Sequence, residues 1–121
     1  MQTVLLVEDN PILLEHFRSV LETNGYKVLA VESGEAALEA WNAHSSTIDL
    51  LVSDVVMGAI NGFQVAEKIR CAHRNLPVVL MSGTPASASA NPGDEFLVKP
   101  FSHQALLNAV ARCSSAALTS K

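Results

Sequence analysis

Three acidic residues, a serine and a lysine stand at the ends of apolar runs, and together they could do chemistry. Glu8 and Asp9 end the run TVLLVED, Asp54 ends IDLLVSD, Ser82 ends VVLMS and Lys99 ends EFLVK. Carboxylates about 4 Å apart repel each other by roughly 4 kcal/mol at the effective dielectric of a protein surface, so a cluster of them needs a cation or a raised pKa. Mg²⁺ prefers such oxygen ligands, and a lysine and a hydroxyl opposite could hold phosphate oxygens. These groups suit phosphoryl transfer, in which positioning and neutralisation of charge supply most of the catalysis.

Each of these residues also has a simpler explanation when it is taken alone. The pair Glu8-Asp9 favours the N-terminus of a following helix. Asp54 is a common type of turn residue, Ser82 fits a solvated loop, and Lys99 fits a surface position. Only convergence at one place would give them a joint role, so the elements that carry them decide the question.

Strand-like and helix-like segments alternate along the chain. Short continuous apolar runs predict buried strands at 3–9, 26–32, 48–54, 78–82 and 95–99. Helices are predicted after the capping residues Asn10, Ser33 and Asn61, and from Ser102 to Cys113. Helical spacing predicts these inward residues: Leu13, Phe17, Val20 and Leu21; Ala37, Leu38 and Trp41; Val65, Ala66, Ile69 and Ala72.

This alternation predicts an α/β fold in which helices cover both faces of a parallel sheet. The ligand site of such a sheet lies beyond the carboxyl ends of its strands, near the point where the strand order reverses. The acidic residues, the serine and the lysine all follow strand ends. We therefore expect them to converge on one edge of the sheet.

Length and composition fit one cytoplasmic domain. The 121 residues are 49% hydrophobic and 17% charged, which is enough apolar material for a core. The apolar runs are too short to span a membrane, and the first residues do not form a secretory signal. The formal net charge is −4 and basic residues are scattered, so nucleic acid is not expected as a ligand. Cys71 and Cys113 are expected to be reduced and buried.

The residues that carry the predicted chemistry also resemble a known family. The pair Glu8-Asp9, the segment SDVVMGAING at 53–62, Ser82, and FLVKPF at 96–101 resemble the receiver domain of bacterial two-component response regulators. The resemblance runs from Thr3 to about Cys113. It implies a three-layer (βα)5 fold like that of flavodoxin, with a five-stranded sheet in the order 2-1-3-4-5, and a single receiver domain over residues 1–121.

The resemblance implies a role for each residue at the acidic edge. Asp54 would accept a phosphoryl group from a phosphohistidine on a histidine kinase or a histidine phosphotransfer protein. Asp9 would bind Mg²⁺ directly, Glu8 would act through a metal-bound water, and the main-chain carbonyl of Val56 would complete the protein ligands. Lys99 would pair with phosphoryl oxygens.

The resemblance also implies a switch. Ser82 would hydrogen-bond the attached phosphate, and Phe96 would turn inward in response. Pro100 would follow a cis peptide bond. The downstream protein target is not indicated by the sequence.

The chain departs from the usual pattern of the family at several positions. Gly58 replaces a common proline and Asn61 a common aspartate, and both are expected to loosen the loop without removing a ligand. Val56 places an apolar side chain beside the acceptor, where a polar one could orient attacking water, so slow self-dephosphorylation is predicted. Phe96 has no phenol hydroxyl, so its inward state can gain packing but no hydrogen bond.

The connection GTPASASANPGDE at 83–95 is short for a crossover between parallel strands. Thr84 can cap a helix and Pro92 forbids its continuation, which leaves about two turns at most. We therefore expect the fourth helix of the receiver pattern to be short or absent and the segment to be mobile. A partner would then contact the first helix, the last helix or this loop.

Two other functions remain open. An aspartyl nucleophile with Mg²⁺ also serves phosphatases and phosphotransferases that act on small molecules, although the chain has no inserted cap and Val56 stands where one such group has a second aspartate. A receiver fold used only for docking is the other alternative. The chain is expected to be either a stand-alone regulator, which Met1 directly before the first strand favours, or the receiver of a larger protein. Its histidines are expected on the surface without a relay partner: His16, His44, His73 and His103.

Overall fold

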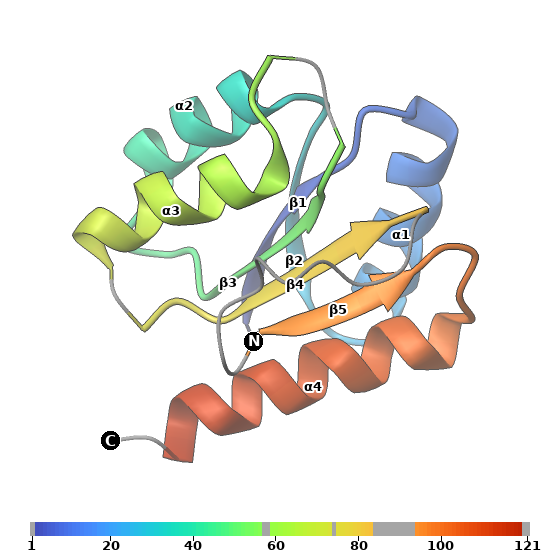
Figure 1. Ribbon diagram of the computed structural model, residues 1–121. Helices are drawn as coiled ribbons and strands as arrows, with labels where there is room; N and C mark the ends of the chain where they lie inside the picture. The colour runs from blue at the N-terminus through green and yellow to red at the C-terminus, as the bar shows by residue number, and fades with distance from the viewer. Residues whose placement is uncertain (1, 57–58, 74, 84–93, 120–121) are drawn as a thin grey trace.

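The computed structural model describes residues 2–56, 59–73, 75–83 and 94–119, of which 114–119 by their backbone only. Strands and helices alternate from the start of the chain (Figure 1). The strands are β1 (Thr3–Val7), β2 (Lys27–Val31), β3 (Leu50–Asp54), β4 (Val78–Ser82) and β5 (Glu95–Val98). The helices are α1 (Pro11–Thr23), α2 (Gly34–His44), α3 (Gly62–Ala72) and α4 (His103–Thr119).

The strands form one parallel sheet in the order β2-β1-β3-β4-β5, which confirms the predicted fold. The order reverses at β1, because β2 lies on one side of it and β3 on the other. All strands point the same way, so their carboxyl ends lie along one edge of the sheet (Figure 1). The crevice expected at a reversal point therefore lies between the ends of β1 and β3.

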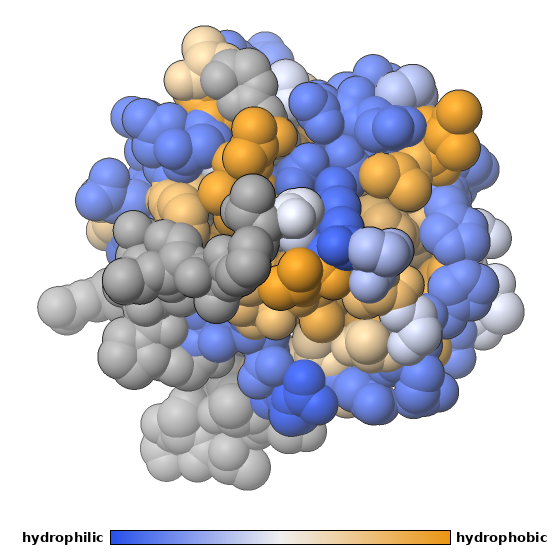
Figure 2. Space-filling view, turned by 45° about the vertical axis from the view of Figure 1, so that its right-hand side comes forward, coloured by the Kyte–Doolittle hydropathy of each residue, from blue (hydrophilic) through white to orange (hydrophobic). Residues whose placement is uncertain are grey.

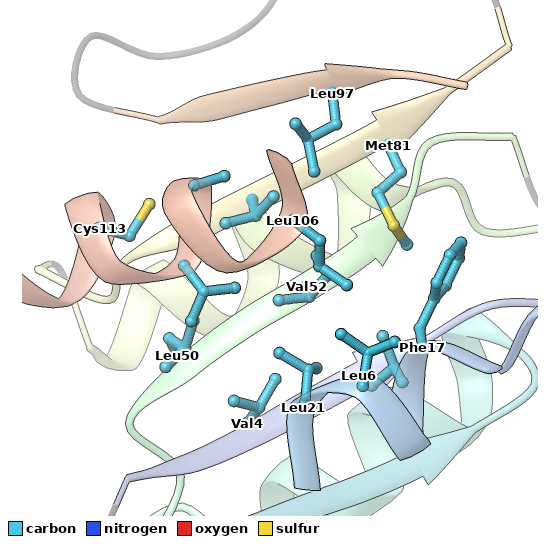
Figure 3. Packing of buried hydrophobic residues seen from close by; sticks show 14 of the residues in the cluster. Val4, Leu6, Phe17, Leu21, Leu50, Val52, Met81, Leu97, Leu106 and Cys113 are labelled. Carbon is cyan, nitrogen blue, oxygen red and sulfur yellow. The ribbon is translucent and has the colours of Figure 1, made fainter. Parts of the chain in front are cut away.

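Two apolar cores hold the helices against the two faces of the sheet. On one face α1 and α4 pack against strand residues such as Val52 and Met81. Figure 3 shows Leu106 of α4 and Phe17 and Leu21 of α1 directed toward the side chains of these strands. On the other face α2 and α3 cover a second cluster around Leu51 and Leu80. Neighbouring residues of β3 thus belong to opposite cores, as the alternation of side chains along a strand requires.

The first turns of the helices are capped as the sequence predicts. Asn10 Oδ1 accepts hydrogen bonds from the main-chain N–H of Ile12 (2.9 Å) and Leu13 (3.2 Å), and Ser33 caps α2. Side-chain acceptors at these positions satisfy N–H groups that have no partner inside the helix. The caps fix where α1 and α2 begin relative to the strands that precede them.

The structure corrects several details of the prediction. Cys71 and Ala72 are exposed, although both were predicted to be buried. Val65, Ala66 and Ile69 carry the buried face of α3, and at 3.6 residues per turn Cys71 lies on the opposite side of the helix. Ala72 is the last residue of the helix and is exposed there.

The ends of some elements also differ from the prediction. Strand β1 ends at Val7, so Glu8 and Asp9 lie beyond it, and α4 continues from Cys113 to Thr119. Ala116, Ala117 and Leu118 favour that continuation, because alanine and leucine have the highest helix propensities. None of the described helices is both long and apolar enough to cross a membrane.

The described residues hold four helices, which fits the expectation that the receiver pattern's fourth helix is short or absent. Most of the connection between β4 and β5, residues 84–93, lies outside the described residues. The expectation that this segment is mobile lies outside them as well. Asp94, which leads into β5, is bound by Arg70 of α3 through two hydrogen bonds of 2.6 and 3.1 Å.

Candidate functional site

Three carboxylates meet at the edge where β1 and β3 end. Val7 pairs with Ser53 in the parallel register, so Glu8 and Asp9 follow β1 beside Asp54, the last residue of β3. One ligand oxygen from each carboxylate lies within 4.8 Å of those from the other two. Among the described residues this is the only group of at least three acidic, histidine or cysteine side chains that could hold a metal ion.

Burial differs within this carboxylate cluster of Glu8, Asp9 and Asp54. Glu8 is 1% exposed and Asp54 6%, whereas Asp9 is exposed. Burial raises the pKa of Glu8 above its usual value, and the negative charge of Asp54 adds to that effect. Hydrogen bonds from Lys99 and from the main-chain N–H of Asn10 oppose the rise in pKa without cancelling it.

Lys99 joins two of the carboxylates. Its Nζ lies 2.6 Å from Oε1 of Glu8 and 3.3 Å from Oδ2 of Asp54. Burial disfavours the charged ammonium, but the hydrogen bond to Glu8 and the attraction of both carboxylates outweigh it and raise the pKa of Lys99. Lys99 therefore stays positively charged and partly balances the cluster.

The main chain holds Lys99 in this position. Its N–H donates a hydrogen bond of 2.7 Å to the carbonyl of Ser82 at the end of β4, and the Lys99–Pro100 peptide bond is cis. Ser82 is 3% exposed. The ends of β4 and β5 thus bring a hydroxyl and an ammonium to the edge that carries the carboxylates.

The remaining residues singled out in the sequence lie near this edge. Val56 is 71% exposed in the loop after β3. Phe96 pairs with Leu80 in the register of β4 and β5 and is partly buried against the core under α2 and α3. The structure thus places Phe96 beside the site strands and leaves the side chain of Val56 in solvent.

Gly62 permits α3 to begin close to Asp54. A Cβ atom at Gly62 would lie 2.4 Å from the main-chain oxygen of Asp54, which is closer than non-bonded atoms approach. Asn61 and Gln64 form a reciprocal capping box at this helix start, with hydrogen bonds of 2.8 and 2.9 Å. Asn61 therefore caps the helix despite replacing the expected aspartate, whereas Gly58 lies outside the described residues.

The chemistry of the donors fits a hard divalent cation. Three carboxylates and one ammonium, all ionised, leave a formal charge of −2 within a few ångströms. Mg²⁺ carries the opposite charge, prefers oxygen ligands, and commonly binds one or two carboxylates together with waters and phosphate oxygens. The exposed Asp9 leaves the cluster open to solvent on one side, as such a site requires.

Apolar side chains are also exposed around this edge. Figure 2 brings the strand ends toward the viewer and shows apolar patches between hydrophilic groups. The exposed large apolar side chains are Ile12 (79%), Val56 (71%) and Val98 (44%). They lie at the start of α1, after β3 and at the end of β5, so each adjoins a segment that carries a site residue.

One contact, between two histidine side chains, was not predicted from the sequence. His16 in α1 and His103 at the start of α4 face each other, with their Nε2 atoms 2.8 Å apart. All four histidines are exposed, as predicted, but the pairing of these two was not foreseen. They are 87 positions apart, and the sequence does not give the rotation of each helix against its neighbour.

Comparison with known proteins agrees with this geometry. The family model described as the response regulator receiver domain matches residues 4–111. The response regulator protein FleR of Pseudomonas aeruginosa is 39% identical over 90% of the chain, which spans only 24% of FleR.

Two crystal structures extend the comparison to the fold. A response regulator receiver protein from Sinorhizobium medicae is 35% identical and superposes with a TM-score of 0.89, with 96% of each chain covered. The response regulator protein TrrA from Thermotoga maritima, solved in complex with Mg²⁺-BeF, is 29% identical with a TM-score of 0.82, covering 93% of this chain and 99% of TrrA. The chain belongs to the family of response regulator receiver domains, the signalling modules of two-component systems.

Proposed function

We propose that Asp54 accepts a phosphoryl group from a phosphohistidine of a histidine kinase or a histidine phosphotransfer protein. The observation that carries this proposal is the position of Asp54. Asp54 belongs to the carboxylate cluster, and its Oδ2 lies 3.3 Å from Nζ of Lys99. Glu8 lies closer to Lys99, at 2.6 Å, but only Asp54 of these two is the last residue of a strand beside the reversal point. A nucleophile for phosphoryl transfer needs positive charge close by, because the transferred group gathers negative charge on its oxygens.

The residues of the site divide the reaction between them. An oxygen of Asp54 forms a bond to phosphorus while the bond between phosphorus and the partner's imidazole nitrogen breaks, and the released imidazole takes up a proton. Lys99 leaves Glu8 to pair with an oxygen of the transferred group. The hydroxyl of Ser82 then donates a hydrogen bond to another of these oxygens.

We assign Mg²⁺ to Asp9, Asp54 and the main-chain carbonyl of Val56 as direct ligands, with Glu8 acting through a bound water. The ion would neutralise the oxygens of the phosphoryl group. Two observations support the assignment: the formal charge of −2 in the cluster, and the Mg²⁺-BeF complex of the related TrrA. The 2.6 Å bond from Lys99 to Glu8 supports an indirect role for Glu8, since one of its oxygens is already occupied.

Phosphorylation of Asp54 would also change the conformation of residues at the same edge of the sheet. As Ser82 moves toward the phosphate, the space beside β4 changes, and we propose that Phe96 turns inward to fill it. Phe96 is partly buried between β5 and the core under α2 and α3, so a change in its packing would alter the surface near β5. That surface would then bind a downstream protein differently.

The wider role of the chain is part of the same proposal. Residues 1–121 would act as a single receiver domain in the cytoplasm, where kinases make phosphohistidine from ATP, and would regulate partners rather than turn over small substrates. If the protein released no phosphate from small phosphate esters, this result would support a regulatory role rather than that of a phosphatase. Relatives such as FleR are longer, so the output of the whole protein is not transferred to this chain.

Acetyl phosphate with Mg²⁺ tests the proposal directly. The wild-type chain should gain the mass of a phosphoryl group, and beryllofluoride with Mg²⁺ should shift its spectra. Asp54→Asn should abolish both effects. Asp49→Asn is the matched control, because Asp49 lies before β3, where its carboxylate accepts a hydrogen bond from Thr3, and an amide can still accept it. Modification of Asp54→Asn, or none of the wild type, would refute the assignment.

A further inference from the structure

A pair of exposed imidazoles lies where α1 faces the start of α4. His16 Nε2 and His103 Nε2 are 2.8 Å apart, and the ring centroids are 4.7 Å apart with an angle of 55° between the ring planes. As neutral rings, one Nε2–H can donate to the other nitrogen. Both side chains are open to solvent, so a dissolved ion can reach them.

We propose that this histidine pair, His16 with His103, is a chelating site for a late first-row divalent cation such as Ni²⁺, Cu²⁺ or Zn²⁺. Imidazole nitrogen suits these ions, whereas Mg²⁺ prefers oxygen. The proposed site is separate from the carboxylate cluster. It would take two ligands from the chain and fill its other positions with water.

The distances fit two nitrogens on one ion. Imidazole nitrogens bind such ions at about 2.0–2.1 Å, so two of them at right angles lie about 2.9 Å apart, as in tetragonal Ni²⁺ or Cu²⁺ sites. The observed separation of 2.8 Å needs almost no adjustment. The ring whose Nε2 carries the proton would move it to Nδ1 by exchange with water, so that both Nε2 atoms present a lone pair.

Aromatic packing beneath the pair holds the two rings in position. Phe17 follows His16 in α1 and stacks on Phe101, which precedes α4, with ring centroids 5.3 Å apart and 21° between the planes. His16 also packs against Phe17 at 5.9 Å. Phe17 is 7% exposed and belongs to the core. The segments that carry the histidines are thus fixed to each other before any ion binds, which lowers the entropy lost on chelation.

Folding is needed to bring the two ligands together, and this gives the site a measurable signature. The histidines are 87 positions apart, so in the unfolded chain they bind an ion only singly. An ion that binds the folded state more tightly raises its stability by mass action. The second imidazole acts at a high effective concentration, and such bivalency raises affinity by roughly 100-fold or more.

Calorimetric titration with Ni²⁺, in the presence of excess Mg²⁺ to occupy the carboxylate cluster, tests the proposal. The wild-type chain should bind a single tight ion, and its thermal midpoint should rise with Ni²⁺. His16→Gln and His103→Gln should each weaken binding by roughly 100-fold and abolish the rise in the midpoint. His44→Gln is the matched control, because His44 is an exposed histidine at the end of α2, and it should bind as the wild type does.

Two results would overturn the inference. If either substitution at the pair leaves Ni²⁺ affinity unchanged, the ion does not bridge the two rings. If His44→Gln weakens binding as much as they do, the ion binds single surface histidines without selection. Reduced stability of a variant without Ni²⁺ would not mimic the expected result, because affinity is measured on folded protein and each variant is compared with its own ion-free midpoint.

Discussion

Asp9 should make the protein less stable in the absence of a cation. Its ligand oxygen lies within 4.8 Å of those of Glu8 and Asp54. Two like charges at that distance repel by about 3 kcal/mol at an effective dielectric of 20. Because Asp9 is exposed, solvent screening reduces this strongly, as it does for exposed ion pairs. We expect Asp9→Asn to raise the free energy of unfolding in EDTA by about 1 kcal/mol.

The same substitution should remove the benefit of Mg²⁺. A cation at 100 times its dissociation constant stabilises a folded protein by about 2.7 kcal/mol, and the wild type should show an effect of this order. Asp9→Asn should show little of it, so the order of stability of the two proteins reverses between EDTA and Mg²⁺. Urea unfolding in both conditions measures this, and an unchanged m-value would show that the denatured state is the same.

Glu39→Gln is the control for the loss of one negative charge, since Glu39 is exposed on α2. It should change stability little and equally in both conditions. The reasoning would be refuted if Asp9→Asn destabilised the protein in EDTA. It would also be refuted if the variant kept the full stabilisation by Mg²⁺, because Asp9 would then not be a ligand.

Three further predictions concern single positions. Gly62→Ala should lower the free energy of unfolding by about 3 kcal/mol, because the added methyl would lie 2.4 Å from the main-chain oxygen of Asp54; a loss too small to resolve by urea unfolding would mean that α3 shifts freely. Burial raises the pKa of Cys113 to about 11, so little of its reactive thiolate is present at neutral pH. In native protein a thiol reagent should therefore label only the exposed Cys71. Rapid labelling of both cysteines would contradict this prediction. The side chain of Val56 is apolar and 71% exposed, so it cannot orient attacking water. Val56→Gln should therefore shorten the lifetime of the phosphorylated protein several-fold. An unchanged lifetime would show that the apolar side chain does not slow dephosphorylation.

The sequence predicts the carboxylate cluster because its position depends only on strand order and strand ends. Asp54 and Lys99 each stand directly at the end of an apolar run, and parallel strands place such ends at one edge. No knowledge of side-chain rotamers is needed for that step. The bond from Lys99 to Glu8 could not be predicted in the same way, because it depends on how far the lysine side chain reaches from the end of β5 past the ends of β4 and β3.

Contacts between helices are harder to predict from the sequence. Cys71 was expected to be buried as a reduced cysteine, but the buried face of α3, formed by Val65, Ala66 and Ile69 as predicted, turns position 71 outward. The meeting of His16 and His103 depends on two such rotations and on the distance between α1 and α4. Small errors in the two helix rotations and in the distance between the helices add up. A surface contact between two helices therefore cannot be predicted even where both helices are.

Very short stretches of chain join the carboxylate cluster to the α1–α4 face, by which we mean the surface where α1 contacts the start of α4 through Phe17, Phe101 and the histidine pair. Asp9 is followed at once by the cap of α1, and Lys99 is followed by Pro100 and by Phe101, which stacks on Phe17 of α1. Phe101 is only two residues after Lys99. A shift of Lys99 from Glu8 toward a phosphoryl group would therefore be transmitted to the stacking of Phe101 on Phe17, which fixes α4 to α1. The core on the other face is reached from β5 through Phe96. Because the α1–α4 face adjoins two site residues directly, we expect its structure to change on phosphorylation as much as that of the surface around β5. An ion bound by the histidine pair would oppose any change that separates α1 from α4.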